Sequence, residues 1–189
     1  SAQSGNTGGL TWAEVSAGVT SDAQQNTVAG TNAGDSFSGT DAVNNSLYGF
    51  NAGTAITTGD NNVSVGHNSL YANTTGGNNV VVGYAALYQN TTASNNTGVG
   101  YAALNANTTG AKNTALGAGA LLANTTASLN TAVGYEAIST NTTGTYLTGI
   151  GHWALASNTT ANHNTAIGYN ALVYNTTGAE NTAIGSKSL

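Results

Sequence analysis

The chain repeats one short phrase with a fixed period of 17 residues. The glycine that closes each Asn-Thr-Ala-aliphatic phrase recurs at this step without insertion, at Gly66, Gly83, Gly100, Gly117, Gly134, Gly151, Gly168 and Gly185. A large aliphatic residue follows each glycine at a fixed distance, at Leu70, Leu87, Leu104, Leu121, Ile138, Leu155, Leu172 and Leu189. A disordered tract has no reason to hold such a register, whereas stacked structural units do. The period therefore predicts an array of equivalent turns.

The array has a looser beginning and a non-repetitive segment before it. The stretches "NTVAGTNAG" (26–34) and "NSLYGFNAG" (45–53) match the phrase but are separated by a 19-residue step. Residues 1–25, which include Trp12, do not match it. We therefore expect a separate N-terminal segment, residues 1–25, that acts as a strand, a cap or an assembly arm. Residues 26–189 form a repeat array of about ten coils, with a strict 17-residue step from residue 45.

Each repeat is too short for a pair of helices, and its residues favour strands. Helical repeats need about 33 residues or more, and the Thr, Asn and Gly that fill each cycle are mediocre or poor helix formers. The phrase "NTALG" (113–117) alternates as a strand does. The triplet "NTT" is typical of a corner, because Asn tolerates left-handed backbone. The predicted fold class is all-β: a β-solenoid, or β-roll, with one 17-residue coil per repeat.

Equivalent residues of successive coils form columns about 4.8 Å apart along the axis of a solenoid. Thr114 and its equivalents are expected to face inward beside an aliphatic column that forms an apolar wall: Val65, Val82, Val99, Leu116, Val133, Ile150, Ile167 and Ile184. One column of alanines marks close packing, within the coil or against another chain: Ala86, Ala103, Ala120, Ala137, Ala154 and Ala171. A second small-residue column is expected to face outward and to pair with neighbouring chains: Gly98, Ala115, Ala132, Gly149, Ala166 and Ala183.

Composition and charge exclude several classes of function. The chain carries two lysines, no arginine and a net charge of −5, whereas phosphate binding needs clustered basic residues, so no nucleic-acid partner is expected. No apolar run approaches the roughly 20 residues that span a bilayer, so we expect no membrane insertion. The carboxylates form no recurring pair suited to acid–base chemistry, and His67 and His152 lie 85 residues apart. We expect no enzyme activity, no cofactor and no metal site.

Two columns are candidate sites. Seven asparagines begin N-x-T triplets and are either N-glycosylation acceptors or a ladder of amide hydrogen bonds: Asn73, Asn90, Asn107, Asn124, Asn141, Asn158 and Asn175. Four tyrosines share a stripe with Phe50, His67, Ala118 and His152: Tyr84, Tyr101, Tyr135 and Tyr169. The stripe either grips sugar rings or packs as a ladder between coils.

The stretches "NTAVGYEAI", "NTAIGYNAL" and "NTAIGSKSL" resemble the repeats of bacteriophage tail-fibre and related surface proteins that precede an endosialidase-type intramolecular chaperone domain. They resemble more loosely the "NSxAIG"-type repeats of trimeric autotransporter adhesin heads. The resemblance covers about residues 26–189 and implies a left-handed β-roll in which three chains pack side by side. Two features depart from it: the 17-residue step is longer than that of the adhesin heads, and no chaperone domain follows Leu189.

These observations favour a non-enzymatic structural repeat protein that forms a fibre or shaft of an extracellular appendage. A tail fibre, an adhesin stalk or a surface filament, at a cell or virion surface, fits this expectation. The chain is expected to self-associate, as a homotrimer or as an end-to-end fibre in which the N-terminal segment of one copy covers the last coil of the next.

Two other functions stay open. The alternative is a carbohydrate-binding adhesin head that contacts surface glycans through the tyrosine stripe. An ice-binding solenoid is less favoured, because "NTT" places adjacent threonines at a corner and Thr114 with its equivalents is expected to face inward.

Replacing one member of the leucine column tests the column assignment. Leu121→Asp buries an unpaired charge, and we expect it to cost several kcal/mol and to disrupt neighbouring coils. Lys112→Ala lies in a variable column and should change stability by less than about 0.5 kcal/mol. Thermal unfolding followed by circular dichroism measures both changes, and equal shifts in the two variants would contradict the assignment.

Overall fold

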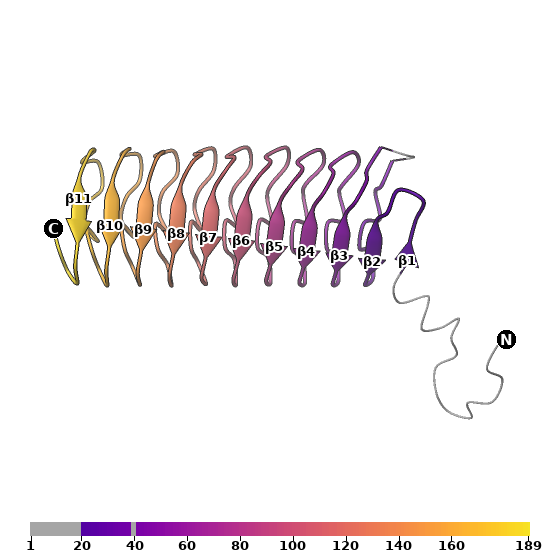
Figure 1. Cartoon of the computed structure of the whole chain (residues 1–189), viewed down its shortest axis with the longest axis horizontal. Helices are drawn as coiled ribbons and strands as arrows, with labels where there is room; N and C mark the ends of the chain where they lie inside the picture. The colour runs from indigo at the N-terminus through magenta and orange to yellow at the C-terminus, as the bar shows by residue number, and fades with distance from the viewer. Residues whose placement is uncertain (1–19, 39–40) are drawn as a thin grey trace, which may run out of the picture.

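The structure, a computed structural model, describes residues 20–38 and 41–189. Within these ranges the chain contains strands and no helix, and the strands form one sheet in sequence order (Figure 1). The strands are β1 Thr20–Ser21, β2 Thr27–Ala29, β3 Ser46–Tyr48, β4 Val63–Val65, β5 Val80–Val82, β6 Thr97–Val99, β7 Thr114–Leu116, β8 Thr131–Val133, β9 Thr148–Ile150, β10 Thr165–Ile167 and β11 Thr182–Ile184. The all-β solenoid expected from the period is confirmed.

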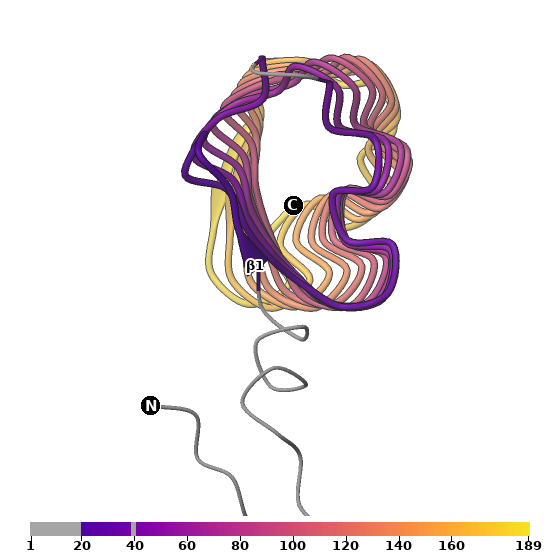
Figure 2. The ribbon, with the colours of Figure 1, turned by 90° about the vertical axis from the view of Figure 1, so that its right-hand side faces the viewer.

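Strands β2 to β11 run parallel and pair in register. From β3 onward each residue pairs with the residue one coil later, as Thr114 does with Thr131, whereas β2 pairs with β3 across the longer first coil. The constant 17-residue coil from residue 45 is therefore confirmed. Viewed along the axis, successive coils repeat one outline, each turned slightly from the one before (Figure 2). From β2 to β11 the rod is about 43 Å long, at about 4.8 Å per coil.

The described part of the N-terminal segment contacts the first coil. Strand β1 pairs antiparallel with β2, Thr20 with Val28 and Ser21 with Thr27. The Asp22 carboxylate accepts hydrogen bonds from the amides of Gln24 and Asn26, which turn the chain from β1 into β2. Residues 20–25 are thus a short strand and turn at the edge of their own chain's sheet. Trp12 lies outside the described residues.

Each of the strands β2 to β11 is followed by a glycine with positive φ, which no other residue can replace without strain. Gly117 has φ of +138°, which L-residues rarely adopt. A Cβ at this position would lie 2.3 Å from the carbonyl oxygen of Gly134 in the next coil. The period is marked by glycine because the backbones of successive coils meet at this turn.

The leucine column lies in the interior, as expected, and has a backbone that the sequence does not reveal. Leu87, Leu104, Leu121 and Leu155 are fully buried and have φ between +45° and +53°. Left-handed backbone costs a non-glycine residue roughly 1–2 kcal/mol. Burial of a leucine side chain contributes about 1.5–3 kcal/mol, which offsets that cost. The side chain and the turn together point this residue into the core.

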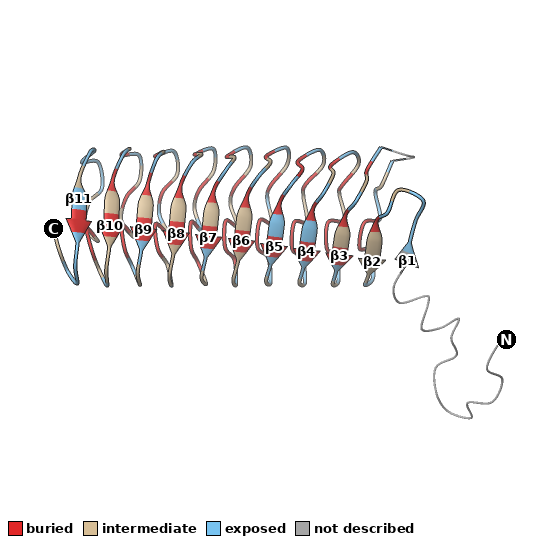
Figure 3. Cartoon of the chain, viewed as in Figure 1, coloured by how far each residue is buried: buried red, intermediate tan, exposed pale blue. Residues whose placement is uncertain are grey.

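The two faces of the strands are the reverse of those predicted from the sequence. In β7 the middle residue, Ala115, is buried, while Thr114 and Leu116 face outward. The same pattern repeats along the rod, so the predicted apolar wall that begins at Val65 lies on the outside and the small-residue column that begins at Gly98 lies inside (Figure 3). At Gly98 the inward position has no room for a side chain, because Leu87 Cδ1 lies 2.5 Å from where a Cβ would be, whereas Leu47 and Val81 fill the same position in earlier coils. The alanine column that begins at Ala86 is also buried, so its close packing is within the coil.

Successive coils alternate in a way that makes a pair of coils the true structural unit. The third residue after each corner asparagine is alternately glycine and alanine: Gly76, Ala93, Gly110, Ala127, Gly144, Ala161 and Gly178. The alanine coils carry a polar residue next, which accepts a hydrogen bond from a backbone amide of the preceding glycine coil. These bonds are Gly77 N to Ser94 Oγ (3.0 Å), Ala111 N to Ser128 Oγ (2.9 Å) and Thr145 N to Asn162 Oδ1 (2.7 Å).

Two glycines of one coil provide a matched test of the turn. We expect Gly117→Ala to destabilise the chain by at least about 2 kcal/mol, because the new Cβ meets backbone and φ is unfavourable. Gly119→Ala should cost less than about 1 kcal/mol, because Ala85 and Ala102 already adopt the same left-handed backbone in neighbouring coils. Chemical denaturation measures both values. Equal losses would show that the first turn is not specific for glycine.

Candidate functional site

The asparagines of the NTT triplets form a buried ladder, here called the corner ladder. Each side-chain amide donates to the Oδ1 of the asparagine one coil earlier, as Asn107 does to Asn90 (2.9 Å) and Asn124 does to Asn107 (2.9 Å). The bonds extend the length of the column: Asn73, Asn90, Asn107, Asn124, Asn141, Asn158 and Asn175. All but Asn175 are fully buried. Of the two alternatives for this column, the geometry supports the amide ladder.

A second column of asparagines, which the sequence analysis did not single out, lies just before the strands and is here called the strand ladder. Its members are Asn26, Asn45, Asn62, Asn79, Asn96, Asn113, Asn130, Asn164 and Asn181. The Oδ1 of each member except Asn181 accepts the backbone amide one coil later, as Asn96 does from Asn113 (2.9 Å). The asparagine of the phrase "NTA" recurs in the sequence because its Oδ1 takes the place of a backbone carbonyl as the acceptor of this hydrogen bond between coils.

The two ladders meet at one backbone carbonyl in six of the coils. The carbonyl oxygen of Gly110 accepts from Asn96 Nδ2 (3.0 Å) and from Asn107 Nδ2 (2.9 Å). The same double acceptance occurs at Gly76, Ala93, Ala127, Gly144 and Gly178. A carbonyl oxygen has two lone pairs, so this acceptor is fully used. Only small residues fit there, since a Cβ on Gly110 would lie 2.1 Å from the oxygen of Ala127.

Leu147 interrupts the strand ladder once. It stands where the other coils carry asparagine, and its amide still donates to Asn130 Oδ1 (2.9 Å). Its side chain offers no amide, and Ala161 O, which stands at the junction, has a bond from Asn158 (3.1 Å). Apolar burial of Leu147 takes the place of the missing bonds.

The remaining residues of the NTT corner have separate roles. The first threonine donates its hydroxyl to the backbone of the next coil, as Thr108 Oγ1 does to Thr125 O (3.1 Å). The second threonine, such as Thr109, faces solvent. A glycan on Asn107 Nδ2 would remove a buried donor and place a large polar group in the core, so the folded coil does not accommodate one.

The tyrosine stripe is a stack of rings. His67 lies 5.2 Å from Tyr84, and Tyr84 lies 5.6 Å from Tyr101, with nearly parallel planes. Farther along, His152 lies 5.1 Å from Tyr135 and 5.5 Å from Tyr169. A ring inside the stack has both faces covered by its neighbours, so it presents only its edge to solvent. His67, Tyr84 and His152 therefore lack the open ring face that a sugar would need, whereas the rings that end each stack have one face that no ring of the stripe covers.

The stack is broken at one point, between Tyr101 and Tyr135. The intervening coil carries Ala118 there, followed by Gly119. Beside the break, Trp153 Nε1 donates to Glu136 Oε2 (2.8 Å). A hydrogen bond to the Glu136 carboxylate, and its negative charge, raise the pKa of Tyr135.

The three histidines are members of aromatic stacks. His67 lies 5.1 Å from Phe50, and His163 lies 4.9 Å from Tyr146. His152 packs edge-on against Trp153, and its Nδ1 is buried without a hydrogen-bond partner. Across residues 20–38 and 41–189, no three His, Asp or Glu side chains gather as metal ligands would.

The outward residues of the strands form a continuous surface, here called the outer strand face. Its apolar column is exposed at Val65, Val82, Leu116, Ile150 and Ile184 and half-buried at Val99, Val133 and Ile167. Val63 and Val80 belong to the neighbouring column. A column of threonines runs beside it, at Thr97, Thr114, Thr131, Thr148, Thr165 and Thr182, partly or fully exposed. Because the strands pair in register, both columns run straight along the rod (Figure 1).

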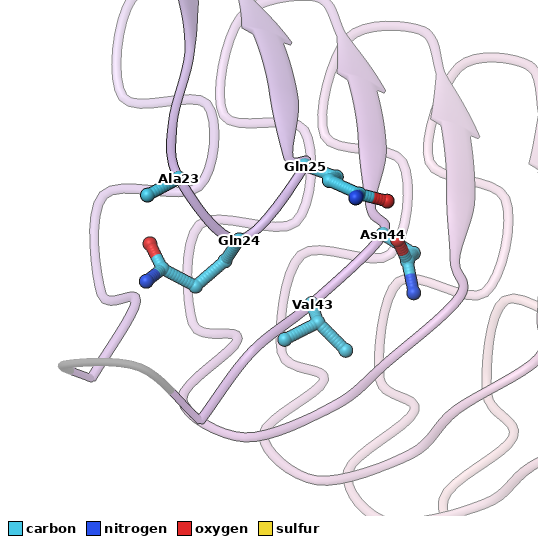
Figure 4. Close-up of a pocket in the computed structure, with 5 residues that line it drawn as sticks. All are labelled: Ala23, Gln24, Gln25, Val43 and Asn44. Carbon is cyan, nitrogen blue, oxygen red and sulfur yellow. The ribbon is translucent and has the colours of Figure 1, made fainter.

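One shallow hollow lies at the N-terminal end of the rod (Figure 4). It is lined by Ala23, Gln24, Gln25, Val43 and Asn44. These residues provide amide groups and no titratable side chain, so the hollow lacks the groups needed for acid–base or nucleophilic chemistry.

The fold and the ladders define a β-solenoid repeat protein with an amide-bonded interior. Comparison of the chain with protein-family models, curated proteins and solved structures gives no match. Among the described residues, no helix has the length and apolar character needed to cross a membrane.

Truncating one member of the corner ladder tests how much it stabilises the rod. Asn107→Ala removes three buried hydrogen bonds, two that Asn107 donates and one that it accepts from Asn124, and leaves the Oδ1 of Asn90 without a donor. We expect a loss of about 2–3 kcal/mol. Asn105→Ala, two residues earlier, removes one partly buried bond to Ala85 O and should cost less than about 1 kcal/mol. Urea denaturation measures both, and a cost for Asn107→Ala no larger than for Asn105→Ala would contradict a stabilising ladder.

Proposed function

We propose that this chain is a non-enzymatic structural segment of an extracellular fibre or shaft, built from copies packed side by side through the outer strand face. The observation that carries the proposal is the straight column of exposed valine, leucine and isoleucine along a rigid rod. Large continuous apolar surfaces on a protein mark contacts with partners. The resemblance to tail-fibre and adhesin repeats adds the expectation of three chains and of a location at a cell or virion surface.

The construction of the rod suits a load-carrying role. Parallel pairing in register joins every coil to the next, and two asparagine ladders add side-chain bonds in the same direction. Pulling the ends apart therefore loads many hydrogen bonds at once. A low charge content also suits lateral packing, since 5% charged residues leave little like-charge repulsion between identical chains.

The residues proposed to form the lateral contact between chains differ from those expected from the sequence. The sequence analysis placed lateral pairing at Gly98, Ala115 and their equivalents, but these residues line the interior of the coil. The proposed contact therefore uses the column of Leu116 and Ile150 instead, which is exposed in the single chain.

Ice binding remains a second candidate, because the structure removes one objection to it. Thr114 and its equivalents do not face inward; they form a regular outward column on parallel strands. From β6 to β11, each strand still carries one threonine and one aliphatic residue rather than two threonines on this face, and β3, β4 and β5 carry no threonine. A monomeric chain that shows thermal hysteresis would favour this candidate over the fibre.

Two leucines of one coil provide a matched test of lateral association. Leu116 lies on the outer strand face and Leu122 lies outside the strands, and both are 38% exposed. We expect native mass spectrometry of the wild-type chain to give three times the 18.6 kDa chain mass. Leu116→Glu should dissociate this assembly, because three carboxylates would be buried without partners, whereas Leu122→Glu should leave it intact.

Either of two results would contradict the proposal: a wild-type chain that stays monomeric at high concentration, or equal dissociation by both variants. Circular dichroism of each variant confirms that the coil itself remains folded.

A further inference from the structure

The break in the aromatic stripe has the thickness of one ring. Coils repeat about every 4.8 Å, so Tyr101 and Tyr135, two coils apart, are separated by about 9.6 Å along the axis. A ring midway would stand about 4.8 Å from each, close to the 5.1–5.6 Å at which the stripe's own rings stack. Tyr101 is 64% exposed, against 50% for the stacked Tyr84, in keeping with an uncovered face, whereas Tyr135 on the other side of the break is 48% exposed. Ala118 and Gly119 leave the floor of this gap without a bulky side chain.

Polar groups at the break differ from those elsewhere along the stripe. Glu136 is the only carboxylate between Asp60 and Glu180, and its Cγ lies 3.0 Å from where a Cβ on Gly119 would be. Trp153 holds its carboxylate in place (2.8 Å). A carboxylate accepts about four hydrogen bonds. With Trp153 and Tyr135 as partners, Glu136 retains capacity for hydroxyl donors.

We propose that this break, bounded by Tyr101, Tyr135, Ala118 and Gly119, binds one neutral pyranose ring between the two tyrosines, with Glu136 accepting its hydroxyl groups. Tyrosine presents an apolar face to the ring and a hydroxyl at its rim. A hydroxyl-rich ligand uses the carboxylate, which an aromatic side chain of a protein partner does not. The inference does not depend on the proposed fibre role.

The two open faces also select the configuration of the sugar. A ring held between two tyrosines needs C–H groups on both of its faces, and a β-glucoside has them because all its substituents are equatorial. A galactoside turns one hydroxyl toward a tyrosine face, which leaves that hydroxyl desolvated. An anionic sugar is repelled by Glu136 and by the net charge of −5. The break therefore favours gluco-configured neutral sugars.

Saturation-transfer NMR on the full chain with methyl β-D-glucopyranoside at millimolar concentration tests whether the break binds a sugar. We expect saturation at the axial protons of both sugar faces, and less with methyl β-D-galactopyranoside or an N-acetylneuraminic acid glycoside. Ala118→Tyr places the stripe's own ring in the gap and should abolish the signal while leaving the melting temperature unchanged or higher. Glu136→Gln should weaken binding about tenfold, since a hydrogen bond to a charged group is lost.

Tyr101→Ala and Tyr169→Ala form the matched control, because both remove a ring from the stripe but only Tyr101 borders the gap. Loss of binding in the first and retention in the second supports binding at the break. Absence of saturation transfer to the glucoside in the wild-type chain would overturn the inference. So would an undiminished signal in folded Ala118→Tyr, or equal losses in the two tyrosine variants.

Discussion

The structure depends on a backbone carbonyl that, in six of the coils, accepts hydrogen bonds from two asparagine side-chain amides. At Gly110 these donors are Asn96 and Asn107, which belong to opposite ends of the coil's non-strand path. The shared acceptor ties the strand to the corner inside one coil, while the ladders tie each coil to the next. An unpaired buried amide is costly, so each asparagine in these columns has its hydrogen bonds satisfied only when neighbouring coils are in register.

This dependence explains how a chain with so few charges specifies a single register. A slip of one residue would place threonine or alanine where an amide is required and leave the carbonyls of Gly110 and its equivalents without donors. Leucine packing alone discriminates less, because small shifts still bury apolar surface. The amides therefore supply specificity, and Leu121 with its column supplies most of the apolar burial.

The period, the strands and the buried leucines could be predicted from the sequence because each recurs at one spacing. The faces of the strands could not, since a three-residue strand such as Thr114–Leu116 alternates equally well in either sense. The inward position also differs in size from coil to coil, since it holds the buried Val81 in one coil and Gly98 in the next, where Leu87 leaves no room for a Cβ. The break beside Tyr101 was visible as Ala118 in the tyrosine column, but its carboxylate neighbour, Glu136, becomes meaningful only when the coils are stacked.

The alternation of glycine and alanine coils determines how many coils can be added to or removed from such a rod at a time. Ser94 accepts an amide from the glycine coil before it, and Ser128 does the same for the next pair. Removing a single coil would join two coils of the same kind, with the hydroxyl acceptor either missing or without its donor. Recombination between repeats, in nature or in the laboratory, therefore preserves the interior when it adds or deletes 34 residues, the distance from Ser94 to Ser128. The length of the rod therefore changes in steps of two coils.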